Sequence, residues 1–308
     1  MASKILIGGG TGFIGRHLAQ ILRKSGYDVI AISRQPHGNS ISWAQLDRQG
    51  LPPDCKAVIN LAGQNLLDPL KRWNEQLKEE IYTSRVQTTE TLTNAIIRSS
   101  NKPEVFISTS AVGYYEPSET AEYTEDSEGG NFDFLSMLCK DWEDAAKLPP
   151  NIGDVRQVTV RVGVVLGREG GVILRSYFPF FFGLGGRIGS GNQWFPWIHI
   201  ADIAGIYQHA IENTNVSGIL NGVAPNPVTN QQFTKAFAGA MSRPAFFPVP
   251  EFVMKAVFGA DRARVILEGQ KVLPKRTLES GYQFSYPDIQ SACQEVSRFL
   301  LNYDFTNK

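Results

Sequence analysis

A glycine-rich string between a strand-like run and a helix most constrains the fold of this 308-residue chain. The glycines of Gly9-x-x-Gly12-x-x-Gly15 follow the apolar run Lys4–Ile7, and residues 12–24 carry apolar side chains at helical spacing. In a βαβ unit such glycines allow a tight turn, a close approach of the backbone to a pyrophosphate, and close packing of helix on strand. The N–H groups and dipole of the helix N-terminus favour the anion. The sequence therefore predicts a dinucleotide whose pyrophosphate contacts Gly9, Gly12, Phe13, Ile14 and Gly15.

The end of the second predicted strand, Asp28–Ser33, distinguishes between the two nicotinamide dinucleotides. NAD-binding units usually place Asp or Glu there, where the carboxylate binds the ribose hydroxyls. This chain has Ser33 and Arg34, whose hydroxyl and guanidinium can hydrogen-bond a 2′-phosphate that a carboxylate would repel. We therefore predict NADP(H) rather than NAD(H) as the cofactor. The alternative is that Arg34 is a solvated surface residue.

Strand and helix patterns alternate through the first half of the chain. Strand-like runs lie at Lys4–Ile7, Asp28–Ser33, Ala57–Leu61, Val105–Thr109 and Val155–Val165, and helical patterns lie at 12–24, 71–100 (one helix or two) and 134–147. Strands alternating with helices, without hairpin signals, predict an α/β fold with a Rossmann-type doubly wound parallel sheet. We expect this dinucleotide-binding domain over 1–240, with a substrate loop inserted at 163–200, and a smaller C-terminal cap over 245–300.

Small residues follow the third predicted strand, where a cofactor on a doubly wound sheet would pass. In Leu61-Ala62-Gly63 they allow the chain to run beside an adenine or a ribose; a glycine that merely stops a strand is the alternative. The helical stretch after them carries Glu80 and Arg85, five residues apart and therefore on different faces. Both are candidate cofactor ligands, although charged residues on a helix are more often solvated.

Composition excludes several classes of partner. Lys+Arg and Asp+Glu both number 30, so no net charge attracts nucleic acid or an anionic membrane surface. No stretch approaches the roughly 20 apolar residues of a membrane span, and no N-terminal signal peptide is recognisable. The three cysteines are far apart and the four histidines do not cluster, so we expect neither a disulfide framework nor a metal site. A reducing compartment, the cytoplasm first, fits best, and import into a mitochondrion stays open.

Several strings together resemble one protein family. They are ILIGGGTGFIG, SR after the second strand, NLAG, ISTSAVGYY, RVGVVLG, WIHIAD and LEGQKVLPKRTLESGYQF. The chain resembles the extended or atypical short-chain dehydrogenase/reductase superfamily, and within it the NADP-binding "epimerase family protein" subgroup with a C-terminal domain of unknown function. The resemblance covers roughly residues 4–290. It implies NADP(H), an unidentified small-molecule substrate and, because relatives are often dimers, a homodimer.

The superfamily also implies a catalytic set: a Ser that orients the substrate carbonyl, a Tyr acid/base, and a Lys four residues after the Tyr that lowers its pKa. On this sequence Ser110 takes the Ser position and Lys140 the Lys position, but Ser136 stands where the Tyr is expected. A serine hydroxyl is a far poorer acid than a phenol. Three interpretations stay open: Tyr114 or Tyr115 supplies the proton, water or a carboxylate supplies it, or NADPH is bound without turnover. Ser110 could instead be a turn-forming hydroxyl, and Lys140 a solvated lysine.

Three further features lie downstream. Arg161, inside a predicted strand, needs an anionic or carbonyl partner, which is either the nicotinamide end of the cofactor or a carboxylate within the fold. His199 and Asp202 of WIHIAD resemble a superfamily motif, in which we expect Asp202 to cap the next helix. The aromatic residues of 177–197 form either a pocket wall over the nicotinamide, or core or interface.

These features support two hypotheses of function. The first is an NADP(H)-dependent oxidoreductase acting on a small carbonyl or alcohol, since hydride transfer is the chemistry of the cofactor. The second is a non-catalytic NADPH-binding protein that senses redox state or scaffolds a partner. Ser136 favours the second, whereas Ser110 and Lys140 favour the first.

Overall fold

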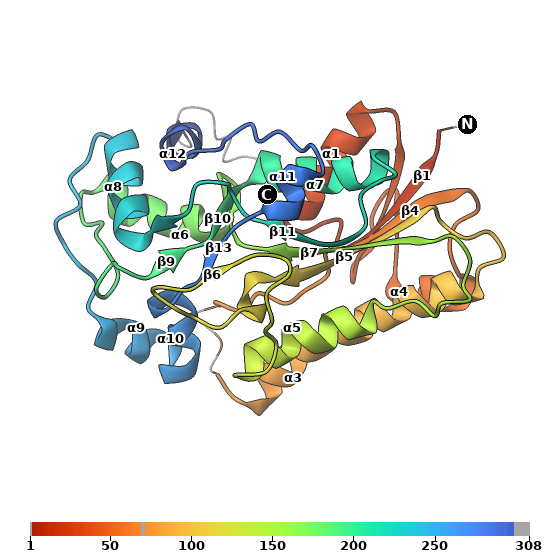
Figure 1. Ribbon diagram of the computed structural model, residues 1–308, viewed down its shortest axis with the longest axis horizontal. Helices are drawn as coiled ribbons and strands as arrows, with labels where there is room; N and C mark the ends of the chain where they lie inside the picture. The colour runs from red at the N-terminus through yellow and green to blue at the C-terminus, as the bar shows by residue number, and fades with distance from the viewer. Residues whose placement is uncertain (1, 69–70, 72, 299–308) are drawn as a thin grey trace.

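A sheet of seven parallel strands lies at the centre of the computed structural model, which describes residues 2–68, 71 and 73–298 (Figure 1). In spatial order the strands are β11 (Gly218–Gly222), β7 (Arg156–Val162), β5 (Val105–Ala111), β4 (Cys55–Asn60), β1 (Lys4–Gly8), β2 (Asp28–Ile32) and β3 (Ser40–Ile41). The chain runs outward from β1 to β3, returns to β4, and then continues toward the other edge. The predicted doubly wound parallel sheet is confirmed, and its topological switch point lies between β1 and β4.

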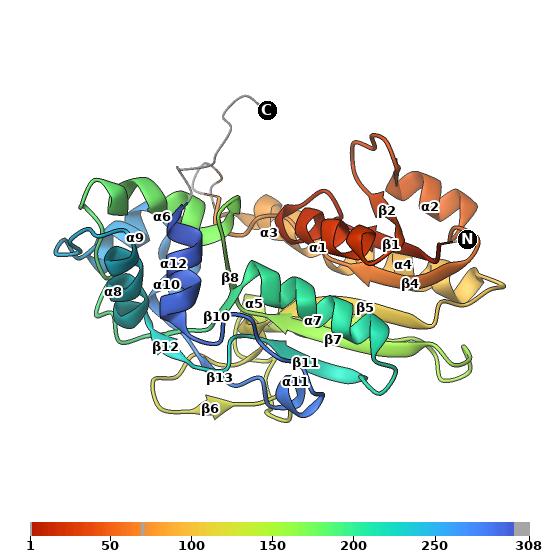
Figure 2. The same ribbon diagram turned by 90° about the horizontal axis from the view of Figure 1, so that it is seen from above.

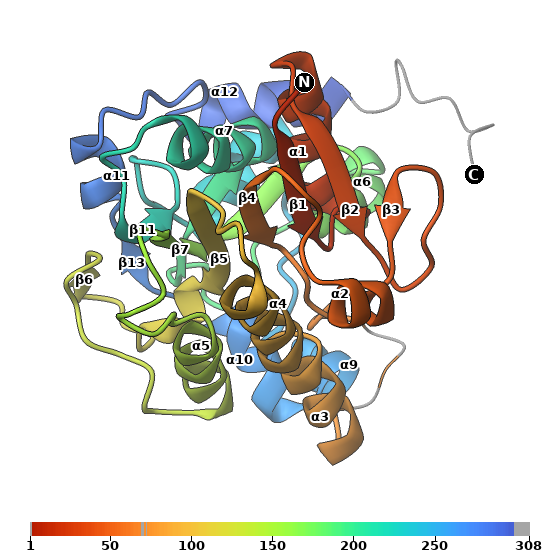
Figure 3. The ribbon, with the colours of Figure 1, turned by 90° about the vertical axis from the view of Figure 1, so that its right-hand side faces the viewer.

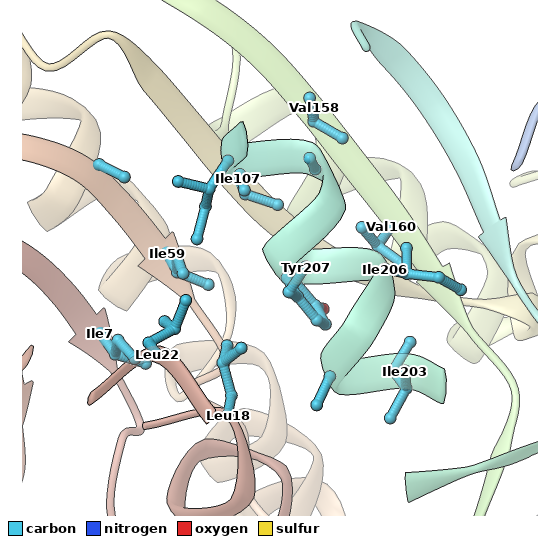
Figure 4. Packing of buried hydrophobic residues seen from close by; sticks show 14 of the residues in the cluster. Ile7, Leu18, Leu22, Ile59, Ile107, Val158, Val160, Ile203, Ile206 and Tyr207 are labelled. Carbon is cyan, nitrogen blue, oxygen red and sulfur yellow. The ribbon is translucent and has the colours of Figure 1, made fainter. Parts of the chain in front are cut away.

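Helices cover both faces of the sheet, as the end-on view shows (Figure 3). On one face lie α1 (Phe13–Lys24) and α7 (Ile200–Glu212), and on the other lie α2 (Trp43–Gln49), α3 (Glu75–Thr83), α4 (Val86–Arg98) and α5 (Phe134–Ala145). Side chains of α1 and α7 fill the first interface. Leu18 and Leu22 of α1 lie beside Ile7 of β1, and Tyr207 of α7 lies among the branched residues of the central strands (Figure 4). Burial of these alternating β-branched side chains holds the strands in register.

The remaining elements gather mostly at the carboxyl ends of the strands and form a lobe to one side (Figure 2). Its helices are α6 (Gly171–Phe181), α8 (Asn230–Ala240), α9 (Glu251–Phe258), α10 (Ala260–Leu267) and α12 (Ile289–Val296). Its strand pairs are β8 (Val164–Gly167) with β10 (Trp197–His199), and β9 (Trp194–Phe195) with β12 (Val228–Thr229). On the edge of the main sheet lie the short helices η1 (Val112–Tyr114) and α11 (Lys275–Glu279) and the strand pair β6 (Glu122–Tyr123) with β13 (Lys271–Val272).

The lobe has a core of its own that joins the predicted substrate loop to the C-terminal residues. Tyr177, Phe180 and Trp197 are buried there with Phe237 of α8 and Cys293 of α12. These three aromatic residues of 177–197 therefore form core, one of the two alternatives left open by the sequence. The expected cap, 245–300, does not lie in one place, since α12 packs on α8 whereas α11 packs on β11. The division into domains at 240–245 stays a prediction.

Two predicted elements are divided in the structure. The helical stretch 71–100 consists of α3 and α4, which are separated at Ser84 and Arg85. The stretch Val155–Val165 is split at Gly163, where a Cβ would lie 2.3 Å from the carbonyl oxygen of Pro196. Within the ranges 2–68, 71 and 73–298, no helix is long and apolar enough to cross a membrane.

Candidate functional site

The glycine loop lies between β1 and the first turn of α1, next to the switch point of the sheet. Gly9 has a φ of +73°, a conformation that favours glycine. A Cβ on Gly15 would lie 2.3 Å from the carbonyl oxygen of Gly9, so the helix can approach the loop only through a glycine. Gly12 precedes α1, and no side chain caps the helix there. The N–H groups of the first turn are therefore available to an anion.

The side chains of Phe13 and Ile14 are used in packing, which leaves their backbone N–H groups as the binding elements. Ile14 packs against the core under α1. The ring of Phe13 lies against the turn from β8 to α6, where a Cβ on Gly170 would come within 2.7 Å of it. This contact places the turn 167–171 beside the glycine loop, so the lobe meets the Rossmann unit at the predicted phosphate site.

At the end of β2, three polar residues meet next to the glycine loop. The Thr11 hydroxyl donates to Ser33 Oγ at 3.5 Å, and Ser33 Oγ also accepts from the Gln35 N–H at 3.2 Å. Arg34 is exposed, and in the part of the chain that the structure describes its side chain has no hydrogen bond or ion pair. Ser33 and Arg34 thus lie at the end of β2 as the sequence predicts, and no carboxylate of the described residues pairs with the Arg34 guanidinium.

The loop after β4 runs directly alongside the glycine loop. The Leu61 N–H donates to the Gly8 carbonyl at 2.8 Å. The fully buried amide of Asn60 fixes the turn, since it donates to Thr89 Oγ1 at 2.7 Å and accepts from the Ala62 N–H at 3.1 Å. Leu61, Ala62 and Gly63 therefore line the switch point as predicted from their sequence position. Asn60, which the sequence reasoning named only as the first residue of the NLAG string, is a positioning residue whose buried amide holds this turn.

The two charged candidates on the next helices lie in different places. Glu80 pairs with Lys71 at 2.6 Å on the surface of α3. Arg85, at the junction of α3 and α4, lies beneath Gly63, where a Cβ would be 3.3 Å from the Arg85 Cζ. Arg85 therefore lies next to the loop after β4. Glu80 forms a surface ion pair with Lys71.

Ser110 lies at the carboxyl end of β5, on the side of the sheet covered by α5. It is 1% exposed, and its Oγ has no hydrogen-bond partner among the residues that the structure describes. The thiol of Cys139 on α5 lies beside it. Burial raises the pKa of Cys139 to about 12, and the neighbouring Ser110 hydroxyl and Arg85 charge lower it only in part. An unpartnered buried hydroxyl is rare and points to an absent ligand or water.

Ser136, at the expected tyrosine position, has a structural role. Its N–H donates to Asp133 Oδ1 at 2.8 Å, and its hydroxyl accepts from the Asp133 N–H at 2.9 Å, which forms a capping box at the start of α5. Ser136 is fully buried, so this hydroxyl cannot replace a phenol. Lys140, one turn later, is exposed.

Of the two candidate tyrosines after β5, Tyr115 is hydrogen-bonded to other residues in the interior of the fold. Its hydroxyl is fully buried, donates to Asn221 Oδ1 at 2.9 Å and accepts from Arg161 at 2.9 Å. The ring of Tyr114 lies 3.5 Å from the Arg161 Cζ. The same ring lies close to Lys140 of α5, since a Cβ on Gly130 would be 2.8 Å from Tyr114 Cε2 and 3.0 Å from the Lys140 Cβ.

Arg161 has the internal partner that was one of its two alternatives. Its Nε and Nη2 donate to the two carboxylate oxygens of Glu143, both at 2.8 Å. The side chain is 2% exposed. Although burial opposes the charge, the hydrogen bonds and charge of Glu143 raise the pKa of Arg161. The guanidinium that the sequence assigned to the cofactor is therefore used to join β7 to α5.

The structure corrects the prediction for WIHIAD. The cap of α7 is His199, whose Nδ1 accepts from the Ala201 N–H at 3.2 Å, and not Asp202. Asp202 lies inside the first turn, fully buried, and accepts from the N–H groups of Ser285 and Tyr286 at 2.7 and 2.9 Å. A buried carboxylate needs such donors, and here they are supplied by a segment more than 80 residues away. Asp202 therefore fastens the C-terminal segment to α7.

Comparison with known proteins decides the family. Residues 5–136 match the model of the NAD dependent epimerase/dehydratase family, and residues 249–296 match a domain of unknown function (DUF1731). The cattle protein named epimerase family protein SDR39U1 is 53% identical over 95% of this chain and 99% of its own length. The chain belongs to the epimerase family. The resemblance seen in the sequence is thereby confirmed.

Two further relatives extend the comparison. The crystal structure of human SDR39U1 (isoform 2), determined with NADPH, superposes with a TM-score of 0.94 at 51% identity and covers 96% of this chain and 100% of that one. An Arabidopsis thaliana relative, 38% identical over 95% of this chain and 86% of its own length, is named a chloroplastic homologue. The fold is therefore shared with the human relative.

Proposed function

We propose that this protein binds NADP(H) at the switch point of its sheet. Three observations support the proposal: the uncapped first turn of α1 at the glycine loop, the exposed Arg34 beside Ser33 at the end of β2, and the NADPH in the crystals of the human relative. The pyrophosphate would bind the N–H groups of Phe13 and Ile14, and the 2′-phosphate would bind Ser33 and Arg34. Leu61, Ala62 and Gly63 would lie along the adenosine half of the cofactor.

We further propose that the protein is an oxidoreductase that transfers a hydride between this cofactor and a small carbonyl or alcohol. The observation that carries the proposal is the Ser110 hydroxyl, which is buried at the end of β5 with no hydrogen-bond partner among residues 2–68, 71 and 73–298. Bound NADP(H) supplies the hydride chemistry. Ser110 would donate its hydrogen bond to the substrate carbonyl and orient it, and Lys140 would contribute positive charge on the exposed side.

The proton source in this proposal is water, because both nearby tyrosines contact the Arg161 guanidinium. Tyr115 is already hydrogen-bonded to Arg161 and Asn221. The Tyr114 ring packs against the Arg161 guanidinium, whose Cζ lies 3.5 Å from the ring centroid. We therefore expect Tyr114→Phe to keep turnover within about threefold of wild type, whereas Ser110→Ala loses about 100- to 1,000-fold, the usual range when one hydrogen-bond donor to the transition state is removed. Loss of turnover in Tyr114→Phe would restore the phenol as the acid.

The test of the proposal is oxidation of NADPH by a panel of aldehydes, ketones and quinones, followed through loss of the reduced-nicotinamide absorbance. Turnover with at least one of them, reduced in Ser110→Ala at unchanged NADPH affinity, supports the proposal. Tight NADPH binding without turnover of any panel member contradicts it.

The same result would favour the second candidate function, a non-catalytic NADPH-binding redox sensor or scaffold. The observation that favours this candidate is the capping role of Ser136, which stands at the position where the superfamily places its catalytic tyrosine. A sensor must distinguish the two oxidation states, so it would bind NADPH and NADP+ with affinities that differ by about tenfold or more.

A further inference from the structure

The segment that follows α8, residues 241–260, is rich in apolar side chains and has no buried residue. It contains four phenylalanines, of which Phe246 is 81% exposed and Phe252, in α9, is 72% exposed. Within the ranges 2–68, 71 and 73–298, every other α-helix buries at least one residue, whereas α9 buries none. A single exposed apolar residue needs no explanation, but a contiguous exposed group indicates an interaction surface.

The turn after α6 extends this exposed surface. It lies along the segment 241–260, since a Cβ on Gly183 would be 3.4 Å from Pro244, and the Val249 N–H donates to the Arg187 carbonyl at 2.8 Å. The loop between α8 and α9 forms the end of the lobe farthest from β1 (Figures 1 and 2). We call the large exposed side chains of the two stretches the apolar face: Phe182, Leu184, Phe246, Phe247 and Phe252.

Three cations surround a groove of about 540 Å³ that borders the apolar face. The groove is lined by Arg187, Lys235 and Arg243 together with Phe246, and none of its lining residues is acidic. Among the described residues none of the three cations has a carboxylate partner, since the two arginines donate to backbone carbonyls and Lys235 forms no hydrogen bond. Positive charge is therefore concentrated here, which the net charge of the whole chain does not reveal.

The apolar face offers few groups for hydrogen bonds. Pro244, Pro248 and Pro250 carry no N–H, and the Val249 N–H is satisfied within the fold. The aromatic residues of 241–260 are all phenylalanines, which have no polar group. An interface with another protein carries about ten hydrogen bonds and is enriched in Tyr, Trp and Arg. A surface this poor in hydrogen-bonding groups fits hydrocarbon better than it fits a protein.

A second copy of this chain fits the apolar face less well than an anionic surface does. An isologous dimer brings the same patch of both subunits together. The three cations of each copy would then meet those of the other, and no acidic residue of the groove would separate them. Anionic lipids carry the complementary charge, and each Lys or Arg near such a surface strengthens binding by roughly fivefold.

We propose that the apolar face and its cationic groove dock this protein on an anionic lipid surface. The exposed phenylalanines enter the boundary between headgroups and acyl chains, and the three cations bind the lipid phosphates. The lipid meets the outer end of the lobe, whereas β1 and β2 lie at the opposite end of the molecule (Figure 2). The inference is independent of the reaction that the protein catalyses.

The test is sedimentation of the protein with vesicles of phosphatidylcholine alone and of phosphatidylcholine with phosphatidylglycerol. We expect binding to the anionic vesicles to be about 10- to 100-fold tighter, because three cations contribute, and to weaken as salt is raised. Phe246→Ser combined with Phe252→Ser should lower the affinity for the anionic vesicles by about tenfold or more, since two rings no longer leave water. Lys235→Gln should lower it by roughly fivefold.

Met137→Ser and Arg48→Gln are the matched controls, since each changes an exposed residue of the same kind on α5 or α2. Both should bind the anionic vesicles as wild type does. Every variant should keep the urea midpoint and NADPH affinity of wild type, because the substituted side chains are exposed.

Three results would overturn the proposal: wild type binds neither kind of vesicle, it binds both kinds equally, or the phenylalanine variant binds as wild type does. Sedimentation velocity without lipid tests the second copy as the occupant. A wild-type dimer that the phenylalanine variant converts into a monomer would also overturn the proposal, because the apolar face would then join two copies of the chain.

Discussion

The first turns of α1 and α5 both lie at the carboxyl edge of the sheet, and the chain treats them in opposite ways. At α1 the residue before the helix is Gly12, and no side chain meets the free N–H groups. At α5 the residues Asp133 and Ser136 form a capping box that satisfies them. One helix start is left open for a ligand, whereas the other is closed by its own side chains.

The uncapped start of α1 serves cofactor binding, whereas the capped start of α5 lies where the superfamily carries out catalysis. The open turn lies between β1 and β4, so the features expected for a dinucleotide are complete there. At the closed turn Ser136 occupies the position at which the superfamily places its acid, and its hydroxyl is held by Asp133. Evidence for NADP(H) is accordingly stronger than evidence for any particular reaction.

The largest expected effect comes from filling the open turn. Gly15→Val places side-chain atoms where even a Cβ would be 2.3 Å from the Gly9 carbonyl oxygen, so the loop must move away from α1. We expect NADPH affinity, measured by fluorescence titration, to fall by about 100-fold or more. Gly239→Ala in α8 is the control, because nothing lies within 4 Å of its Cβ. It should bind NADPH normally, and equal losses in both variants would contradict the role of the glycine loop.

A smaller effect is expected at the end of β2. Arg34→Asp replaces the exposed guanidinium with a carboxylate that repels a 2′-phosphate and can accept from ribose hydroxyls. NADPH affinity should fall by about 10- to 100-fold, in line with the loss of charge-assisted hydrogen bonds, while NADH affinity rises. The control is Arg48→Asp, the same charge change on the exposed side of α2. An unchanged ratio of the two dissociation constants would rule out Arg34 as the selecting residue.

The smallest effect is expected at the closed turn. Ser136→Ala removes one half of the capping box, and loss of an N-terminal cap costs about 1 kcal/mol of unfolding free energy. The urea midpoint should fall accordingly. NADPH affinity and any turnover found in the carbonyl panel should stay at the wild-type level, because the hydroxyl serves only the helix. A loss of turnover much larger than the loss of stability would make Ser136 part of the reaction.

The sequence predicts the sheet well because its signals are local. Continuous β-branched runs such as Asp28–Ile32 and Val105–Ala111 can be buried on both faces only as central parallel strands. The break between α3 and α4 was left open because Ser84 and Arg85 carry no glycine or proline signal. The helix α6 was not predicted, since Pro179 and a run of phenylalanines obscure its period. The helical conformation of α6 is instead stabilised by packing in the core of the lobe.

In the candidate site, too, features set by local sequence could be predicted and features set by tertiary packing could not. The glycine loop and Ser33-Arg34 could be predicted because each depends on a short stretch of chain. The meeting of Arg85, Ser110 and Cys139 could not, because it joins α4, β5 and α5, which are far apart in sequence. For the same reason the sequence could not choose between the cofactor and Glu143 as the partner of Arg161.

A crystal structure of this protein with NADPH tests both halves of the comparison at once. We expect pyrophosphate oxygens at about 3 Å from the N–H groups of Phe13 and Ile14, the 2′-phosphate at Ser33 and Arg34, and the nicotinamide C4 facing Ser110. Ser136 should remain bonded to Asp133. A nicotinamide directed away from Ser110, or a pyrophosphate bound elsewhere than at the open turn of α1, would contradict the proposed function.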